Sequence, residues 1–256
     1  MIDLDGIAMI WLRDLLRFFR ERSQLLGSVS RPVLWLLILG TGLGAALRPG
    51  VHGTSAAAGE SYTQFIFPGI IGMSLIFASI QSAISIIWDR EFGFLKEVLV
   101  APVSRTSVAV GKALSGATLA VVQGAITLVF APIVGVKFAV FSALTLVPVM
   151  FLIGFALTGV GILIAARMTS FEGFGTISNF LVMPMYFLSG AIFPPVHLPE
   201  WLYILVRVNP MSYGVDALRA TLLHRHYFPL PFDFGFLAAF AALMVAIGVI
   251  AFTRPE

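Results

Sequence analysis

The sequence predicts an all-α membrane protein with six transmembrane helices, forming a single transmembrane domain over residues 1–256. Its composition is the first indication, because 59% of the residues are hydrophobic and only 11% are charged, against about 25% charged in soluble domains. The second is a series of apolar segments, most of them long enough to cross a hydrocarbon core of about 30 Å. The third is the placement of Lys and Arg at the flanks of these segments, as the positive-inside rule predicts.

Composition also excludes several classes of function. The chain contains no cysteine, so it has no disulfides, no thiolate metal site and no cysteine nucleophile. The sequence pI of about 9.5 is typical of some nucleic-acid-binding proteins. Because the basic residues flank apolar segments, we assign them to the membrane surface and expect no nucleic-acid partner.

The first expected element is an amphipathic helix over residues 7–22. Apolar residues are expected to share one face of this helix, and charged residues the other. The apolar face holds Trp11, Leu12, Leu15, Leu16, Phe18 and Phe19, and the polar face holds Arg13, Asp14, Arg17, Arg20 and Glu21. Such a helix is expected to lie in the membrane interface and to contact lipid.

Six apolar segments follow, and we expect each to be a transmembrane helix. At about 1.5 Å per residue, most reach across the hydrocarbon core, whereas the first is short and rich in glycine. The third and fourth segments are expected to form a tight helical hairpin around residues 135–139. The expected spans are residues 32–47, 62–88, 106–134, 140–166, 174–193 and 234–253.

The distribution of Lys and Arg predicts the orientation. With six spans both termini lie on one side, and that side carries eleven basic residues against five on the other. The positive-inside rule then places both termini in the cytoplasm and the chain in the inner or plasma membrane. The eleven are Arg13, Arg17, Arg20, Arg22, Arg31, Arg90, Lys96, Arg105, Lys112, Arg167 and Arg254; the five are Arg48, Lys137, Arg207, Arg219 and Arg225.

A cytoplasmic link with the sequence DREFGFLKEVLVAPVSR spans residues 89–105. Phe92, Phe94 and Leu95 are expected to gather on one side of a short helix that Pro102 ends. Two interpretations follow equally from this pattern. The helix docks into a partner protein, or it is a loop helix that rests on lipid.

The stretch from Met183 to Leu223, which precedes the last span, contains several residues that are expected to end or start helices. Pro194 and Pro195 are expected to stop the preceding helix, and Pro199 to start a new one. Asn209 and Pro210 are expected to break the chain again and to cap a second short helix. The sequence therefore predicts two short external helices within residues 194–223, at the end of a membrane span.

Side chains in this stretch allow two further expectations. Trp201 and Tyr203 are residue types that settle at a membrane–water interface. Asp216 and Arg219 are three residues apart on one helix, so they share a face and can pair. We interpret that pair as structural in preference to a substrate site.

Polar residues within the spans are few. Gln81, Gln123 and Asn179 are expected to form interhelical hydrogen bonds, worth about 0.6–2 kcal/mol each, or else to contact a substrate. His224 and His226 lack the further ligands of a good metal site, so no metal is expected. Because the span centres contain no ionisable residue, an ion-coupled transporter or a channel is the less favoured alternative.

Two sequence motifs together resemble the permease subunit of a type 2 ATP-binding-cassette exporter. One is REFGFLKEVLVAPVSR after the second span, and the other is FLSGAIFPPVHLPEWL with NPMSYGVDALR between the fifth and sixth. The resemblance covers nearly the whole chain and is greatest to the drug-resistance and nodulation-factor export branch. The polysaccharide exporters share the architecture but usually lack a close match to NPMSYGVDALR.

The resemblance implies a half-transporter that exports an amphiphilic substrate: a drug, a lipid or a glycolipid. Two permease chains, identical or closely related, would form the pore within membrane lipids, above two ATP-binding subunits. The coupling helix that contacts the ATPase would comprise Arg90, Glu91, Phe92, Gly93, Phe94, Leu95, Lys96 and Glu97. The external gate motif would comprise Pro194, Pro195, Pro199, Trp201, Asn209, Pro210, Tyr213, Asp216 and Arg219.

No segment of the sequence fits a phosphate-binding loop, which requires GxxxxGK[ST]. The nearest match is Gly111-Lys112, but Thr106 stands where the first glycine is required and Ala113 replaces the hydroxyl residue. We therefore expect no ATPase activity and no cofactor in this chain. ATP and Mg²⁺ would be bound by the partner subunits.

Overall fold

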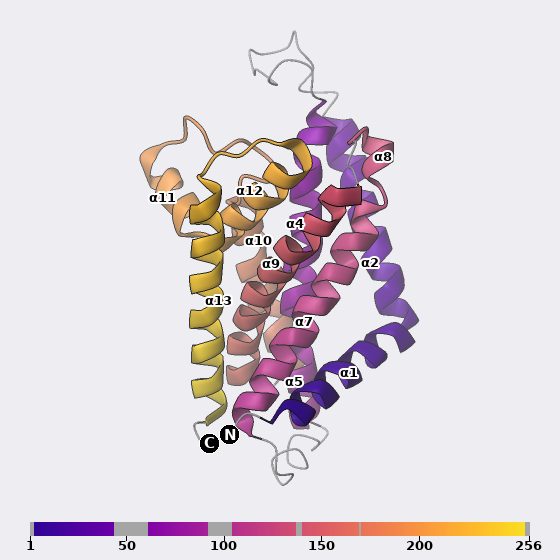
Figure 1. Cartoon of the computed structure of the whole chain (residues 1–256), viewed down its shortest axis with the longest axis vertical. Coiled ribbons are helices and arrows are strands. Elements are labelled where there is room, and N and C mark those ends of the chain that lie inside the picture. The colour runs from indigo at the N-terminus through magenta and orange to yellow at the C-terminus, as the bar shows by residue number, and fades with distance from the viewer. Residues whose placement is uncertain (1–2, 44–60, 92–103, 137–139, 169, 254–256) are drawn as a thin grey trace.

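The computed structural model describes residues 3–43, 61–91, 104–136, 140–168 and 170–253, and within them every regular element is a helix (Figure 1). The predicted all-α class is therefore confirmed for the described part of the chain. The helices are α1 (Leu4–Arg20), α2 (Arg22–Trp35), the π-helix η1 (Leu36–Leu43), α4 (Tyr62–Ser82), α5 (Ile84–Glu91), α7 (Arg105–Leu128), α8 (Ala131–Val134), α9 (Val140–Arg167), α10 (Phe171–Phe187), α11 (Glu200–Val208), α12 (Pro210–Leu223) and α13 (Leu230–Thr253).

Long helices α4, α7, α9 and α13 form the bundle and run along its long axis (Figure 1). Four helical segments of the described chain are long and apolar enough to cross a membrane: Tyr62–Asp89, Thr106–Leu128, Leu144–Arg167 and Leu230–Ile250. They coincide with the second, third, fourth and sixth spans that the sequence predicts. The chain thus has the helices of a multi-pass membrane protein.

The other two predicted spans correspond to shorter helices. For the first, the apolar helix Leu26–Gly40 is shorter than a full crossing, and it begins six residues before the predicted start at residue 32. For the fifth, α10 has 17 residues, against about 20 for a full crossing. The count of six spans therefore stays a prediction.

Serine side chains mark where several of these helices begin. The Ser61 hydroxyl accepts a hydrogen bond from the Thr63 amide, and the Gln64 side chain accepts one from the Ser61 amide, which is a capping box. The hydroxyls of Ser104 and Ser170 cap α7 and α10 by accepting a hydrogen bond from the amides of Ser107 and Gly173. These caps satisfy amide groups that would otherwise lack a partner at the helix ends.

Helices α7 and α9, which the sequence predicts to form a helical hairpin, pack closely against each other, whereas residues 137–139 of the predicted turn lie outside the described residues. A Cβ at Gly154 on α9 would lie 3.1 Å from the Cα of Ala117 and 2.8 Å from the Cβ of Ala120, both on α7. Glycine is needed here because the two backbones approach so closely. Small residues at facing positions allow this approach within a membrane.

The N-terminal helix differs from the predicted division into an apolar and a polar face. Leu15 and Phe18 do not face lipid but are buried against Leu119 on α7. Asp14, expected on the polar face, is buried as well. The apolar residues left exposed on α1 are Leu4, Met9, Trp11, Leu12, Leu16 and Phe19.

The helix before the prolines ends earlier than predicted. α10 stops at Phe187, before Pro194 is reached, because the chain turns through Gly190, whose φ of +71° lies in the left-handed region. The prediction that Pro194 and Pro195 stop this helix is therefore wrong. The next helix begins where predicted, with Pro199 immediately before α11.

The two short helices occupy different environments. On α11 most residues are exposed, and only Val206 is buried. α12 is buried almost throughout and packs against α4, α9 and α13. The second short helix is therefore packed into the bundle, whereas the first is largely exposed.

Candidate functional site

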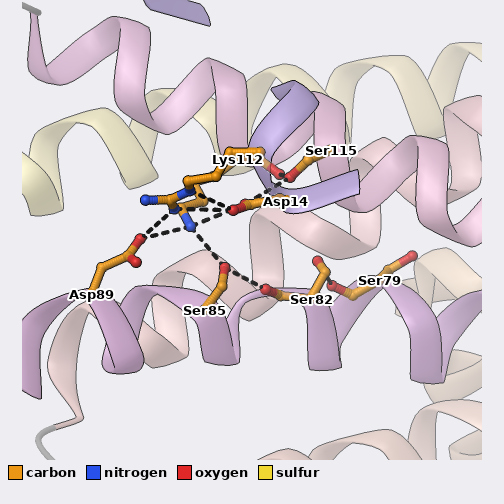
Figure 2. A network of polar contacts seen from close by, with 8 residues as sticks. Asp14, Ser79, Ser82, Ser85, Asp89, Lys112 and Ser115 are labelled. Carbon is orange, nitrogen blue, oxygen red and sulfur yellow. Dashed lines mark hydrogen bonds and ion pairs between the residues drawn. The ribbon is translucent and has the colours of Figure 1, made fainter. Parts of the chain in front are cut away.

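Four charged side chains, three of them buried and Arg13 partly exposed, form a cluster at the end of the bundle where α1 and α5 lie (Figures 1 and 2). Lys112 on α7 contacts two carboxylates, with Nζ 3.0 Å from Asp14 Oδ2 and 2.8 Å from Asp89 Oδ2. Arg13 Nη2 contacts the same two residues, at 3.0 Å from Asp14 Oδ1 and 2.8 Å from Asp89 Oδ2. Two cations and two anions therefore balance one another across α1, α5 and α7.

Hydroxyl groups complete the coordination of the buried charges (Figure 2). Lys112 Nζ donates to Ser85 Oγ at 2.8 Å, and Ser115 Oγ donates to Asp14 Oδ2 at 3.3 Å. The Lys112 side chain is only 4% exposed. Such a charge is tolerated away from water only when it is paired and hydrogen-bonded.

The cluster also determines the protonation of its acidic member on α1. Burial by itself would raise the pKa of Asp14, but the charges of Lys112 and Arg13 outweigh burial and hold that pKa below its ordinary value. Asp14 is therefore ionised at neutral pH. A protonated Asp14 would leave the excess positive charge of Lys112 and Arg13 buried.

This cluster is adjacent to the residues that were predicted to contact the ATPase. Asp89 directly precedes Arg90 and Glu91, which form the last two residues of α5. The remaining predicted contact residues, Phe92 to Glu97, lie outside the described residues. The helix before the link and the helix after it, α5 and α7, are both held to α1 by the cluster.

Sequence reasoning missed this cluster. Arg13 and Asp14 were assigned to a solvated polar face, and Lys112 was counted only as a basic residue flanking a span. One signal was available, because Lys112 stands eighth in α7 and its neighbours on that helix from Ser107 to Val122 are all small or apolar. An ionisable residue in such a run requires a partner.

At the other end of the bundle, Asn209, a residue of the predicted gate motif, joins α12 to α10. Its Oδ1 accepts a hydrogen bond from the Met211 amide and caps α12, as predicted, with Pro210 in the first turn. Its Nδ2 donates to the carbonyl of Met185 on α10 at 2.6 Å. The same side chain therefore starts α12 and attaches it to α10.

Tyr213, Asp216 and Arg219 are buried in α12. The Tyr213 hydroxyl donates to the carbonyl of Arg207 at 2.6 Å. The Asp216 carboxylate accepts hydrogen bonds from the amides of Tyr227, at 2.8 and 3.0 Å, and Phe228, at 2.9 Å. Both side chains therefore fix neighbouring backbone.

The predicted Asp216–Arg219 pair is present but loose. Arg219 Nη1 lies 3.8 Å from Asp216 Oδ1, whereas Arg219 Nη2 donates to the carbonyl of Gly190 at 2.8 Å. The guanidinium also lies over the rings of Phe65 and Tyr227, with Cζ 4.6 and 5.2 Å from their centroids. These contacts support the structural interpretation of the pair.

The prolines and Trp201 of the gate motif are not drawn together into one site. Pro194 and Pro199 are exposed, Pro195 is buried, and Trp201 is 64% exposed on α11. Within the described residues no group of His, Asp and Glu side chains could hold a metal ion. His226 instead contacts the backbone, with Nδ1 2.9 Å from the carbonyl oxygen of Phe228.

Comparison with known proteins identifies the class, because residues 6–223 match the ABC-2 type transporter family. The chain belongs to this family. It is therefore a multi-pass membrane transport permease, as the two motifs in the sequence indicated.

Individual relatives agree with this assignment. The inner membrane transport permease YadH of Escherichia coli K12 is 30% identical over 248 residues, which cover 94% of this chain and 92% of YadH. Nodulation protein J of Rhizobium leguminosarum bv. viciae is 27% identical over 84% of this chain and 81% of its own length. The putative transport permease ycf38 of Cyanophora paradoxa is 29% identical over 80% of this chain and 70% of its own length.

Proposed function

We propose that this chain is the membrane-spanning permease of an ATP-driven exporter that moves an amphiphilic drug, lipid or glycolipid out of the cytoplasm. The match of residues 6–223 to the ABC-2 type transporter family carries this proposal. That range includes both the link at residues 89–105 and the NPMSYGVDALR motif. The similarity to nodulation protein J supports the resemblance to the drug-resistance and nodulation-factor export branch.

The proposed permease works with two separate ATP-binding subunits, which bind ATP and Mg²⁺. Their contact is residues 90–97, which comprise the last two residues of α5 and the start of the link to α7. The charge cluster supports this assignment, because Asp89 at the end of α5 and Lys112 on α7 are bonded to each other and to α1. A displacement of the link would therefore reach α1, α5 and α7 together.

The proposed topology has six spans with both termini in the cytoplasm. The eleven-to-five distribution of Lys and Arg supports it. The position of α1 supports it too, since α1 lies at the same end of the bundle as the C-terminal end of α13 (Figure 1). An even number of crossings produces this arrangement.

A second permease copy, identical or closely related, completes the proposed pore within the surrounding lipid. The first and fifth spans are the proposed contact, because Gly42 in η1 and Gly175 in α10 have open space where a Cβ would be. Gly40, by contrast, faces its own chain, because a Cβ there would lie 2.9 Å from Thr63 Cγ2. Gly44, also in the predicted contact, lies outside the described residues.

Reconstitution tests the proposed function. The permease is co-expressed with its ATP-binding subunits, placed in proteoliposomes and supplied with labelled drugs, lipids and glycolipids. ATP-dependent movement of one of these classes, absent with a non-hydrolysable ATP analogue, is the expected result. Substrate movement that depends on an ion gradient and not on ATP would instead show that the chain is a secondary transporter or a channel.

A further inference from the structure

A cavity of about 380 Å³ lies beside the charge cluster, between α1, α2, α4, α5 and α7. On α7 it is lined by Ser115, Leu119 and Gln123, which are four residues apart and so lie on successive turns. These positions extend over about 12 Å at 1.5 Å per residue. The cavity is therefore elongated along the bundle and is large enough for a headgroup and the beginning of a hydrocarbon chain.

Two arginines line this cavity, each stacked on an aromatic ring. Arg17 Cζ lies 4.9 Å from the ring centroid of Trp88, and Arg31 Cζ lies 4.4 Å from that of Phe77. Stacking holds a guanidinium in place while leaving its N–H groups available to an anion. Within the described residues neither Arg17 nor Arg31 forms an ion pair with a carboxylate.

The acidic residues of the cavity offset these two cations only in part. Asp14 is already paired with Lys112 and Arg13. Glu21 accepts a hydrogen bond from Gln24 at 2.8 Å, three residues away on the same surface. The four charges of the cluster sum to zero, so Arg17, Arg31 and Glu21 leave the cavity with an excess of one positive charge.

The rest of the lining is amphipathic, and the cavity opens to the outside of the chain. Gln81 and Gln123 contribute amides, whereas Phe18 and Leu119 contribute apolar surface. Arg17, Gln81 and Trp88 are exposed as well as lining it. A molecule in the membrane surface next to α1 can therefore reach both the cations and the apolar wall.

We propose that this cavity binds the phosphate-bearing headgroup of an anionic amphiphile taken from the membrane leaflet next to α1. Arg17 and Arg31 are its ionic contacts, because guanidinium groups form paired, charge-assisted hydrogen bonds with phosphate. The leaflet is the cytoplasmic one if the proposed topology holds, and to that extent the inference rests on the proposed function. Binding itself requires neither ATP nor the ATP-binding subunits.

Native mass spectrometry of the full chain tests the proposal. The chain is purified from nanodiscs of phosphatidylglycerol or of phosphatidylcholine, and the lipids retained after detergent washing are counted. We expect one phosphatidylglycerol retained per chain and no phosphatidylcholine. Millimolar inorganic phosphate should leave that lipid bound, whereas its displacement by phosphate would assign the site to a free anion and overturn the proposal.

Four substitutions locate the site. R17Q and R31Q should each lower phosphatidylglycerol retention about tenfold, as expected for a lost hydrogen bond between charged groups. G27L should lower it with every charge kept, because Gly27 lines the cavity and a Cβ there meets open space. R20Q is the matched control, since Arg20 is exposed on α1 and does not line the cavity.

The outcomes are distinguishable from a failure of the proposed function. Equal retention in R17Q, R31Q, G27L and R20Q would show that the lipid is held elsewhere on the surface and would overturn the site. An unchanged monodisperse elution profile establishes that each variant is folded. If the chain retained phosphatidylglycerol specifically but showed no ATP-dependent transport, the lipid site would be supported and only the proposed export function would be rejected.

Discussion

Lys112 Nζ lies 2.8 Å from Asp89 Oδ2, and this ion pair joins the two helices that flank the link proposed to contact the ATPase. Asp89 is two residues from the end of α5, and Lys112 is the eighth residue of α7. Asp14 and Arg13 add α1 to the same contact. The pair therefore ties α5 to α7 close to the two ends of the link, and the cluster ties both helices to α1.

Removing the buried cation should destabilise the chain. In Lys112→Met the carboxylates of Asp14 and Asp89 remain buried with only Arg13 to balance them, so we expect a loss of about 3–5 kcal/mol in the free energy of unfolding. Unfolding by sodium dodecyl sulfate, followed by circular dichroism, measures the change. The double variant Lys112→Met with Asp89→Asn should recover part of it, because one uncompensated carboxylate is removed.

Arg20→Met is the matched control for that measurement, because Arg20 is exposed at the end of α1. Its unfolding free energy should stay within about 0.5 kcal/mol of the wild type, as for ordinary surface substitutions. A Lys112→Met variant as stable as Arg20→Met would show that the cluster contributes no net stability.

Acidification should release α1 from α7. The pKa of Asp14 is lowered in the folded chain, so its contribution to stability is fully present above the ordinary carboxyl pKa and is lost as the pH falls below about 4. Trp11 reports the docking, since its Nε1 donates to Thr118 Oγ1 on α7 at 3.0 Å. In a variant with Trp11 as its single tryptophan, the fluorescence should shift in this acid range.

Asp14→Asn separates this effect from general acid unfolding. The variant lacks the titrating carboxyl, so it should show weaker α1 docking at neutral pH and a smaller further change on acidification. Identical acid profiles for the variant and the parent would reject Asp14 as the group responsible.

The sequence predicts local features of this fold more successfully than contacts between distant segments. The cap formed by Asn209 and Pro210 is confirmed because the bond to Met211 depends on neighbouring residues only. The pairing of Asp14 with Lys112 could not be predicted, because the two residues are far apart in the sequence and no local pattern specifies the partner. The two residues meet because α1 packs against α7 in the folded bundle.

A small error in helical phase explains the misassigned face of α1. Successive residues differ by about 100° around a helix, so Phe18 and Phe19 point in different directions although both are aromatic. Phe18 is 4% exposed and Phe19 52% exposed. A broad apolar stripe leaves open which part packs against the protein and which part faces outward, and only the position of α7 decides it.

The predicted topology places α11 outside the cell. The native chain has no cysteine, so Glu200→Cys at the exposed start of α11 introduces a single reporter. A membrane-impermeant maleimide should label it in intact cells. Gln24→Cys, exposed near the start of α2, should react only after lysis, and the opposite pattern at the two positions would invert the topology.

The proposed permease dimer predicts different crosslinking at two neighbouring glycines. Gly42→Cys has open space around its side chain and should form a disulfide-linked dimer under mild oxidation. Gly40→Cys should do so far less, because its side chain would meet Thr63 of its own chain. Non-reducing electrophoresis of membranes measures both, and a purified complex with one permease per pair of ATP-binding subunits would reject the dimer.

Coupling between the permease and the ATP-binding subunits should depend on an aromatic side chain in the proposed docking link. Phe94 lies outside the described residues, in the link that follows α5. Buried aromatic anchors dominate interface energies, so Phe94→Ala should cost about 2 kcal/mol of docking, or about 30-fold in affinity. The variant should insert normally into the membrane, lose ATP-driven transport and copurify with less ATP-binding subunit.

Phe19→Ala is a better control for this experiment than Phe18→Ala. Both residues were expected to contact lipid, but Phe18 is buried against Leu119, so its truncation would disturb the packing of α1 on α7. Phe19 is exposed on α1, and its truncation should loosen only the seating of that helix at the membrane. Full transport and normal copurification in Phe94→Ala would show that the link does not couple the permease to ATP hydrolysis. If Phe19→Ala alone lost the copurifying ATP-binding subunit, the docking surface would lie on α1 and not on the link.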